Sequence, residues 1–139
     1  MIQISLPNTP TSWSAAIISK RGSYNPKGKK KTFTRWQIRS LFKDEMIKGF
    51  SVVEFIFTSR IPSSTSKKNR SLMLQGKIRP TRMDSTNCQK FYEDCIKNIL
   101  IEDDRFVARI MSEKVYGERD EVLIKVWSLQ EYEINNRVN

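Results

Sequence analysis

Two periodicities of apolar residues divide the chain into strands and helices. Dense or alternating apolar residues predict β-strands at 2–6, 51–61, 105–116 and 122–129. Apolar residues spaced three and four apart predict helices at 35–48 and 87–98. The order of these elements predicts an α+β fold, a single domain with a mixed β-sheet and two main helices packed on one face.

The helix predicted at 87–98 has a start signal and an apolar stripe. Thr86 followed by Gln89 fits a capping box that would begin the helix near Asn87. Its stripe contains Cys88, Phe91, Cys95 and Ile99. The two cysteines are about 10 Å apart at the helical rise, which is too far for a disulfide within the helix. We therefore interpret both as buried thiols.

The helix predicted at 35–48 would be capped by Thr34 and stopped by Gly49. We expect its apolar stripe to pack on the sheet: Trp36, Ile38, Leu41, Phe42 and Met46. The strands at 105–116 and 122–129 are expected to pair as a hairpin, with Gly117 supplying the backbone freedom at the turn.

Three polar segments have no clear period. Residues 12–34 are predicted to be an irregular basic loop. Aromatic residues among its cations suit contact with DNA, and a mobile solvated loop is an equal alternative. Residues 63–79 are predicted to be a surface loop or an irregular helical turn. Residues 130–139 are predicted to be a flexible tail that frays or lies over the surface. We find no internal repeat and no second domain, so 1–139 is expected to fold as one unit.

The charge of the chain indicates a polyanionic partner. The formal net charge is +10, and no acidic residue precedes Asp44. The residues expected to bind nucleic acid are Lys27, Lys29, Lys30, Lys31, Lys67, Lys68, Arg70, Lys77, Arg79 and Arg82. Without histidine, the chain lacks the commonest general base and the commonest zinc ligand. No apolar run is long enough for a membrane helix, so we expect no membrane partner. The N-terminus has no cationic region followed by an apolar one, so we expect no secretory signal.

Two acidic groups stand out against this basic background. Asp84 is the first acidic residue after Glu54, and the second group is the run 102–104. Carboxylates within a basic field suit metal-dependent phosphodiester chemistry, because carboxylates hold a divalent ion while cations hold the nucleic acid. We expect Asp84 and Asp104 to converge across the start of helix 87–98 and the loop beyond its end.

The same residues carry a resemblance to a known family. Asp84-Ser85-Thr86-Asn87, then Lys90, then the pair Asp103-Asp104 after an apolar segment, resembles the core pattern of the RusA family of phage-type Holliday junction resolvases. The resemblance extends from Arg35 onward. It implies a RusA-like fold and a homodimeric endonuclease that cuts four-way DNA junctions with Mg²⁺ or Mn²⁺. It also implies action in DNA recombination and repair in the cytoplasm of a bacterial host, with phage or prophage origin.

The resemblance assigns roles to individual residues. Asp84, Lys90 and Asp104 would be catalytic, and Asp84, Asp104 and Asp103 would bind the metal, with no small-molecule cofactor. Taken one at a time, the three catalytic candidates also have structural interpretations: a charge at a helix N-terminus, a surface ion pair and a turn, respectively. Their joint spacing favours the functional interpretation.

One departure from the family pattern defines the alternative. Thr86 stands where the family has a second carboxylate, and a hydroxyl supplies no negative charge to a hard divalent ion. The alternative function is therefore a junction- or duplex-binding protein with weakened or lost catalysis. A third hypothesis is a general basic interaction module for RNA or a protein.

Overall fold

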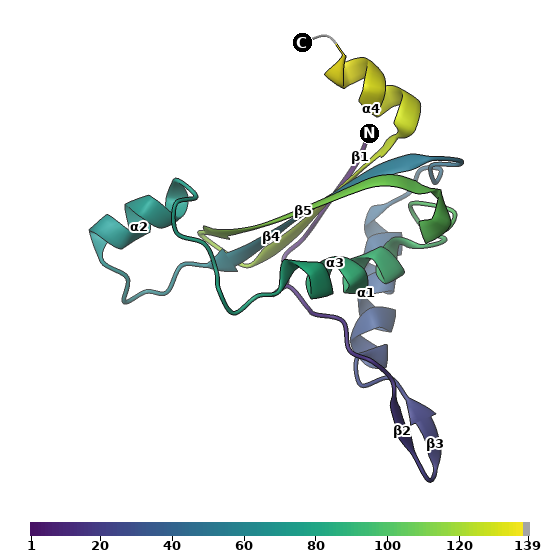
Figure 1. Cartoon of the computed structure of the whole chain (residues 1–139), viewed down its shortest axis with the longest axis horizontal. Coiled ribbons are helices and arrows are strands. Elements are labelled where there is room, and N and C mark those ends of the chain that lie inside the picture. The colour runs from purple at the N-terminus through teal and green to yellow at the C-terminus, as the bar shows by residue number, and fades with distance from the viewer. Residues whose placement is uncertain (138–139) are drawn as a thin grey trace.

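A mixed four-stranded sheet forms the centre of the computed structural model, which describes residues 1–137 (Figure 1). The strand order is β1 (Ile2–Leu6), β6 (Glu121–Ser128), β4 (Ser51–Arg60) and β5 (Val107–Gly117). β6 is antiparallel to β1 and β4, whereas β5 is parallel to β4. Helices α1 (Gly28–Leu41) and α3 (Ser85–Ile96) lie together on one face of the sheet. The predicted single α+β domain with a mixed sheet is confirmed.

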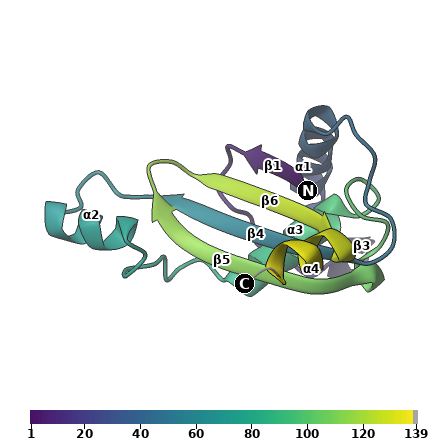
Figure 2. The same cartoon turned by 90° about the horizontal axis from the view of Figure 1, so that it is seen from above.

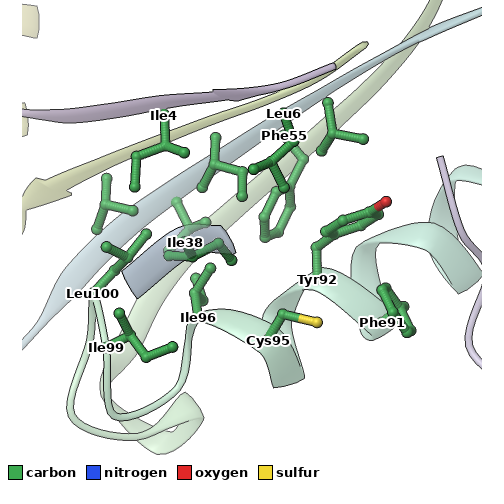
Figure 3. Close-up of a cluster of buried hydrophobic side chains, with 14 of the residues drawn as sticks. Ile4, Leu6, Ile38, Phe55, Phe91, Tyr92, Cys95, Ile96, Ile99 and Leu100 are labelled. Atoms are coloured by element: carbon green, nitrogen blue, oxygen red, sulfur yellow. The ribbon is translucent and has the colours of Figure 1, made fainter. Parts of the chain in front are cut away.

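The core lies between this face of the sheet and the two helices. Val53, Phe55 and Phe57 of β4 are fully buried. Their side chains share the face of the sheet that the helices cover, and each is paired with a buried residue of the neighbouring strand β6. From α3 the core receives Cys88, Phe91, Tyr92, Cys95 and Ile96, as Figure 3 shows for most of them. The predicted apolar stripe of this helix is thus confirmed.

The expected hairpin between the last two long strands is wrong. β5 and β6 are neighbours in sequence, but β4 lies between them in the sheet. The short connection crosses the end of β4, where the Arg60 backbone N–H donates to Asp120 Oδ1 at 2.8 Å and the Ile61 N–H to the Gly117 carbonyl at 3.0 Å. β4 buries side chains on both of its faces, which suits a strand with a neighbour on each side. A direct hairpin of β5 and β6 would have left β4 at an edge of the sheet.

The first helix begins earlier than predicted. α1 starts at Gly28 and ends at Leu41, so Thr34 is a buried residue inside the helix and not its cap. Before α1, strands β2 (Ile17–Ser19) and β3 (Gly22–Tyr24) form a small projecting hairpin (Figure 1). The first turn of α1 contains the lysines at 29–31, which are good helix formers but add no apolar residues to the stripe. A prediction based on apolar spacing therefore began the helix too late.

Two further helices occupy segments expected to be irregular. α2 (Lys67–Leu74) is capped by Ser66, and α4 (Leu129–Asn136) is capped by Ser128. α4 lies over the face of the sheet opposite α3 (Figure 2), where the rings of Tyr132 and Trp127 are 5.3 Å apart. Residues 130–136 therefore form a helix that lies over the sheet and is not a frayed tail, while 138–139 lie outside the described residues. A short 3₁₀ helix, η1 (Asp104–Phe106), precedes β5.

Each helix in residues 1–137 is too short or too polar to span a lipid bilayer.

Candidate functional site

Asp84 is the N-cap of α3. Its Oδ1 accepts hydrogen bonds from the backbone N–H groups of Thr86, at 3.0 Å, and Asn87, at 3.2 Å. The helix therefore starts at Ser85, and the predicted capping box at Thr86 is wrong. Aspartate caps a helix as well as threonine does, and its charge also favours the positive end of the helix dipole. The side chain remains exposed, and Oδ2 has a longer contact of 3.4 Å with Asn87 Nδ2.

A hollow of about 480 Å³ opens in front of Asp84. It is enclosed by the segment after β1, the turn at 80–84, the first turn of α3 and the ends of β4 and β5. The polar side chains among its walls include Thr9, Ser12, Ser59, Arg82, Asn87 and Tyr116. The hollow thus combines a carboxylate with a cation and several hydrogen-bonding groups.

Lys114 lies beneath the turn that carries Asp84. It points from β5 toward the helical face of the sheet, where its Nζ donates to the Met83 carbonyl at 2.8 Å. Its charge also reaches Cys88, whose pKa is raised to about 11 by burial and by Asp84, with Lys114 opposing that rise. The alternation of β5 places Lys114 level with buried Phe57, and that pairing becomes visible only once the sheet register is known.

Lys90 lies on the same side of α3 as Asp84 and Asn87. Its Nζ is 3.5 Å from the centroid of the Trp13 ring, a cation–π contact. The Trp13 backbone N–H donates to the Asn87 carbonyl at 2.9 Å, which fixes the segment after β1 against the start of α3. Lys90 remains exposed, so its charge is presented to solvent beside the hollow.

Asp103 and Asp104 lie beyond the other end of α3. Lys97, the C-cap of the helix, has its Nζ 3.5 Å from Asp103 Oδ1 and 3.8 Å from Asp104 Oδ1. Glu93 belongs to the same neighbourhood, because burial and the charges of Asp104 and Asp94 raise its pKa. These carboxylates form an acidic group with its own lysine.

The expected convergence of Asp84 and Asp104 within one chain is wrong. The 12 residues of α3 separate them, a length of about 18 Å. The sheet gives the same result, since Met83 contacts Lys114 whereas Asp104 precedes Val107, about 23 Å away along β5. The apolar segment after α3 leads the chain to the start of β5 and does not return it to Asp84. Across residues 1–137, no three carboxylate or thiol residues are grouped as a metal site, so one chain alone does not fit a complete ion-binding set.

The predicted DNA-binding residues lie in three places: around α2, at the hollow and at the start of α1. Around α2, Lys67, Lys68 and Lys77 are exposed, whereas Arg70 and Arg79 form ion pairs with Glu118 and Glu113 that fasten this arm to β5 and the turn after it. Arg82 lines the hollow. At the start of α1, Lys29 and Lys30 are exposed, and Lys27 and Lys31 are half-buried. Figure 1 shows α2 and the β2–β3 hairpin projecting on either side of the turn that enters α3.

The family model described as endodeoxyribonuclease RusA matches residues 7–127. The chain belongs to the RusA endodeoxyribonuclease family. Membership implies a nuclease that resolves Holliday junctions. A DNA substrate agrees with the exposed lysines around α2 and at the start of α1. The matched residues include the hollow, α3 and both acidic groups. No curated protein and no solved structure matched the chain.

Proposed function

We propose that this RusA-family chain cuts four-way DNA junctions at the hollow in front of Asp84. One observation carries the proposal: the exposed Asp84 carboxylate, held by the start of α3, lines a hollow that Arg82 also lines. Lys114 binds the carbonyl of Met83 in the wall of this hollow, and Lys90 follows Asn87 of the same wall by one turn of α3. The cations draw in and position a phosphodiester. Asp84 Oδ1 is engaged with the helix, which leaves Oδ2 for a further partner.

We propose that the reaction depends on Mg²⁺ or Mn²⁺ bound at Asp84. Magnesium is commonly held by one or two carboxylates together with substrate phosphates, so DNA itself supplies part of the set. When bound, such an ion polarises the phosphate and lowers the pKa of its water. The remaining acidic ligands, Asp103 and Asp104, are too far away in the same chain.

A homodimer offers a way to complete the set. In a two-fold contact the start of α3 in one copy can face the acidic group of the other, and two identical sites result. A four-way junction has near two-fold symmetry and needs two cuts, which suits such an arrangement. We propose this composite site in place of the single-chain site that the sequence predicted.

The test is cleavage of a synthetic four-way junction with Mg²⁺ or Mn²⁺. Asp84→Asn should reduce cutting at least about 100-fold, because the charge is lost. Folding should be unaffected, because asparagine caps a helix as well as aspartate does. Asp44→Asn, another exposed aspartate, is the matched control and should cut normally. Equal cutting by Asp84→Asn and the unsubstituted chain would rule out this site.

Mixing two inactive variants tests the composite site. If Asp104→Asn is also inactive, a mixture with Asp84→Asn yields heterodimers in which one site regains both aspartates. Cutting should then reappear in the mixture, after subunit exchange, although neither variant cuts alone. No recovery, with exchange verified by differently tagged copies, would contradict a site shared between subunits.

The alternative is a junction-binding protein with weakened catalysis, and Thr86 favours it. Thr86 is exposed in the first turn of α3, next to Asp84, and contributes no charge. Thr86→Asp should raise divalent-ion affinity or cutting. It should fold normally, since a negative charge stabilises a helix N-terminus. Tight junction binding without cutting, by both this variant and the unsubstituted chain, would select the alternative.

A further inference from the structure

Two large aromatic side chains stand exposed on α1. Phe33 is 55% exposed and Trp36 63%, and their ring centroids are 6.1 Å apart with only 26° between the planes. The sequence predicted that Trp36 would pack on the sheet, but Ile38 fills that place and is fully buried. The helix therefore turns Trp36 outward beside Phe33, one turn away. A paired aromatic surface in water indicates a binding site.

The surroundings of this pair are cationic. A shallow hollow on α1 is lined by Gly28, Lys29, Thr32, Phe33 and Trp36. Lys29 is one turn before Phe33 on the same side of the helix. The sequence of α1 contains three lysines and two arginines but no aspartate or glutamate. An apolar ring surface with a lysine at its edge suits a ligand that has a flat face and a negative charge.

We propose that Phe33, Trp36 and Lys29 form a stacking platform for an unpaired DNA base and its phosphate. The near-parallel rings receive the face of a base, and the ammonium group meets the phosphate. Bases within an intact duplex are already stacked on their neighbours, so the platform selects DNA that is opened, as at a branch point. This inference rests on the proposed action on DNA and adds a second contact to it.

The platform is continuous with the hollow at Asp84. Phe33 also lines a neighbouring hollow with Lys30 and Thr9, and Thr9 in turn lines the hollow that contains Asp84. A strand can therefore run from the platform across the segment after β1 to the carboxylate. This places an unstacked base close to the phosphodiester proposed to be cut.

A second copy of the chain is the competing occupant. In a two-fold contact the same patch meets itself, and the exposed Lys29 and Lys30 beside the rings would then face their own copies. Like charges brought together in this way oppose association. DNA brings the opposite charge, so the charge of α1 favours the nucleic acid.

The experiment measures binding in the Asp84→Asn background, so that no substrate is cut. The probes are a 16-nucleotide oligothymidylate, a linear duplex and a four-way junction. Replacing both rings, Phe33→Ala with Trp36→Ala, should weaken oligothymidylate binding about tenfold and duplex binding less than twofold. Alanine favours a helix, so α1 should persist, which circular dichroism can verify. Ile134→Ala, an equally exposed apolar residue on α4, should bind like its parent.

Two further variants separate stacking from simple apolar contact. Phe33→Tyr with Trp36→Tyr should keep affinity for oligothymidylate, whereas Phe33→Leu with Trp36→Leu should lose it. Oligothymidylate should also quench tryptophan fluorescence, and Trp36→Phe should lessen the quenching while binding is retained.

Unchanged oligothymidylate affinity in the double alanine variant would overturn the platform. So would a shift from dimer to monomer in sedimentation, because the rings would then belong to a contact between copies. Failure of the proposed nuclease site would look different: normal cutting by Asp84→Asn, with the binding measurements unaffected.

Discussion

The two ends of α3 carry the same chemical group in different settings. At the start, Asp84 binds backbone N–H groups, and its second oxygen faces a hollow with cations around it. Beyond the end, Asp103 and Asp104 share Lys97, and Arg105 Nε is 3.9 Å from Asp103. The comparison shows that carboxylates of one chain can differ in what they offer to a ligand. Asp84 has a second oxygen beside open space that a phosphate can enter, whereas Asp103 and Asp104 already lie close to cations.

Beyond the proposed acidic ligands, the largest expected effect is at Lys114. Lys114→Met keeps the bulk of the side chain but removes the charge and the hydrogen bond to the Met83 carbonyl. We expect junction cutting to fall about tenfold, because the turn that carries Asp84 loses its support and the hollow loses a positive charge. Arg109→Met, on the same strand but beside Tyr132 of α4, is the control. If Lys114→Met and Arg109→Met cut equally well, Lys114 does not contribute to cutting at the Asp84 end of α3.

The cap of α3 gives a smaller effect, on stability. Asp84→Ala should lower the free energy of unfolding by about 1 kcal/mol, since two backbone N–H groups lose their acceptor. Asp84→Asn should lower it much less. Urea denaturation of the two variants separates the capping role of this residue from its charge. Equal losses in both would mean that charge, and not the cap, stabilises this end of the helix.

At the other end of α3, removing the shared cation should have a weaker effect. Lys97→Met breaks ion pairs that are largely exposed to solvent, so we expect only a small loss in the free energy of unfolding. The loss should shrink further in about 1 M salt, where the Debye length is about 3 Å. A large loss in the free energy of unfolding that does not depend on salt would show that Lys97 binds Asp103 and Asp104 more strongly than their exposure indicates.

A further effect concerns stability at alkaline pH. Burial raises the pKa of Cys95 to about 12 and that of Cys88 to about 11, both from 9.0. The folded protein keeps these protons, whereas an unfolded chain releases them above about pH 9. The stability contributed by both thiols is thus complete below pH 9 and decreases as pH rises toward 11 and 12. Cys95→Ala should flatten the fall in urea stability above pH 9.

Cys88 and Cys95 also report on the two ends of α3 separately. The Asp84 charge helps to raise the pKa of Cys88, but Cys95 lies near Asp94, Lys31 and Arg35 instead. Asp84→Asn should therefore speed alkylation of Cys88 at alkaline pH and leave Cys95 unchanged. Alkylation rates for each thiol can be followed by mass spectrometry. Equal acceleration at both would point to loosening of the whole helix.

The strands were predictable because burial dictates their pattern. β1, β4, β5 and β6 all appear close to their expected positions, and the apolar stripe of α3 is buried as predicted. Alternation or a spacing of three and four is local information, so the sequence displays it directly. The start of α1 and the presence of α2 and α4 were missed, because lysine-rich or polar helices lack such a stripe.

By itself, the sequence determined which residues enter the core, where the positive charge gathers and which family motif the chain carries. Tertiary structure decided the rest: β4 takes the middle of the sheet, Trp36 faces solvent, and Asp84 and Asp104 lie at opposite ends of α3. The physical reason is that each of these depends on competition between distant segments. Ile38 displaces Trp36 from the core. The length of α3 keeps Asp84 and Asp104 apart, although they are close in sequence.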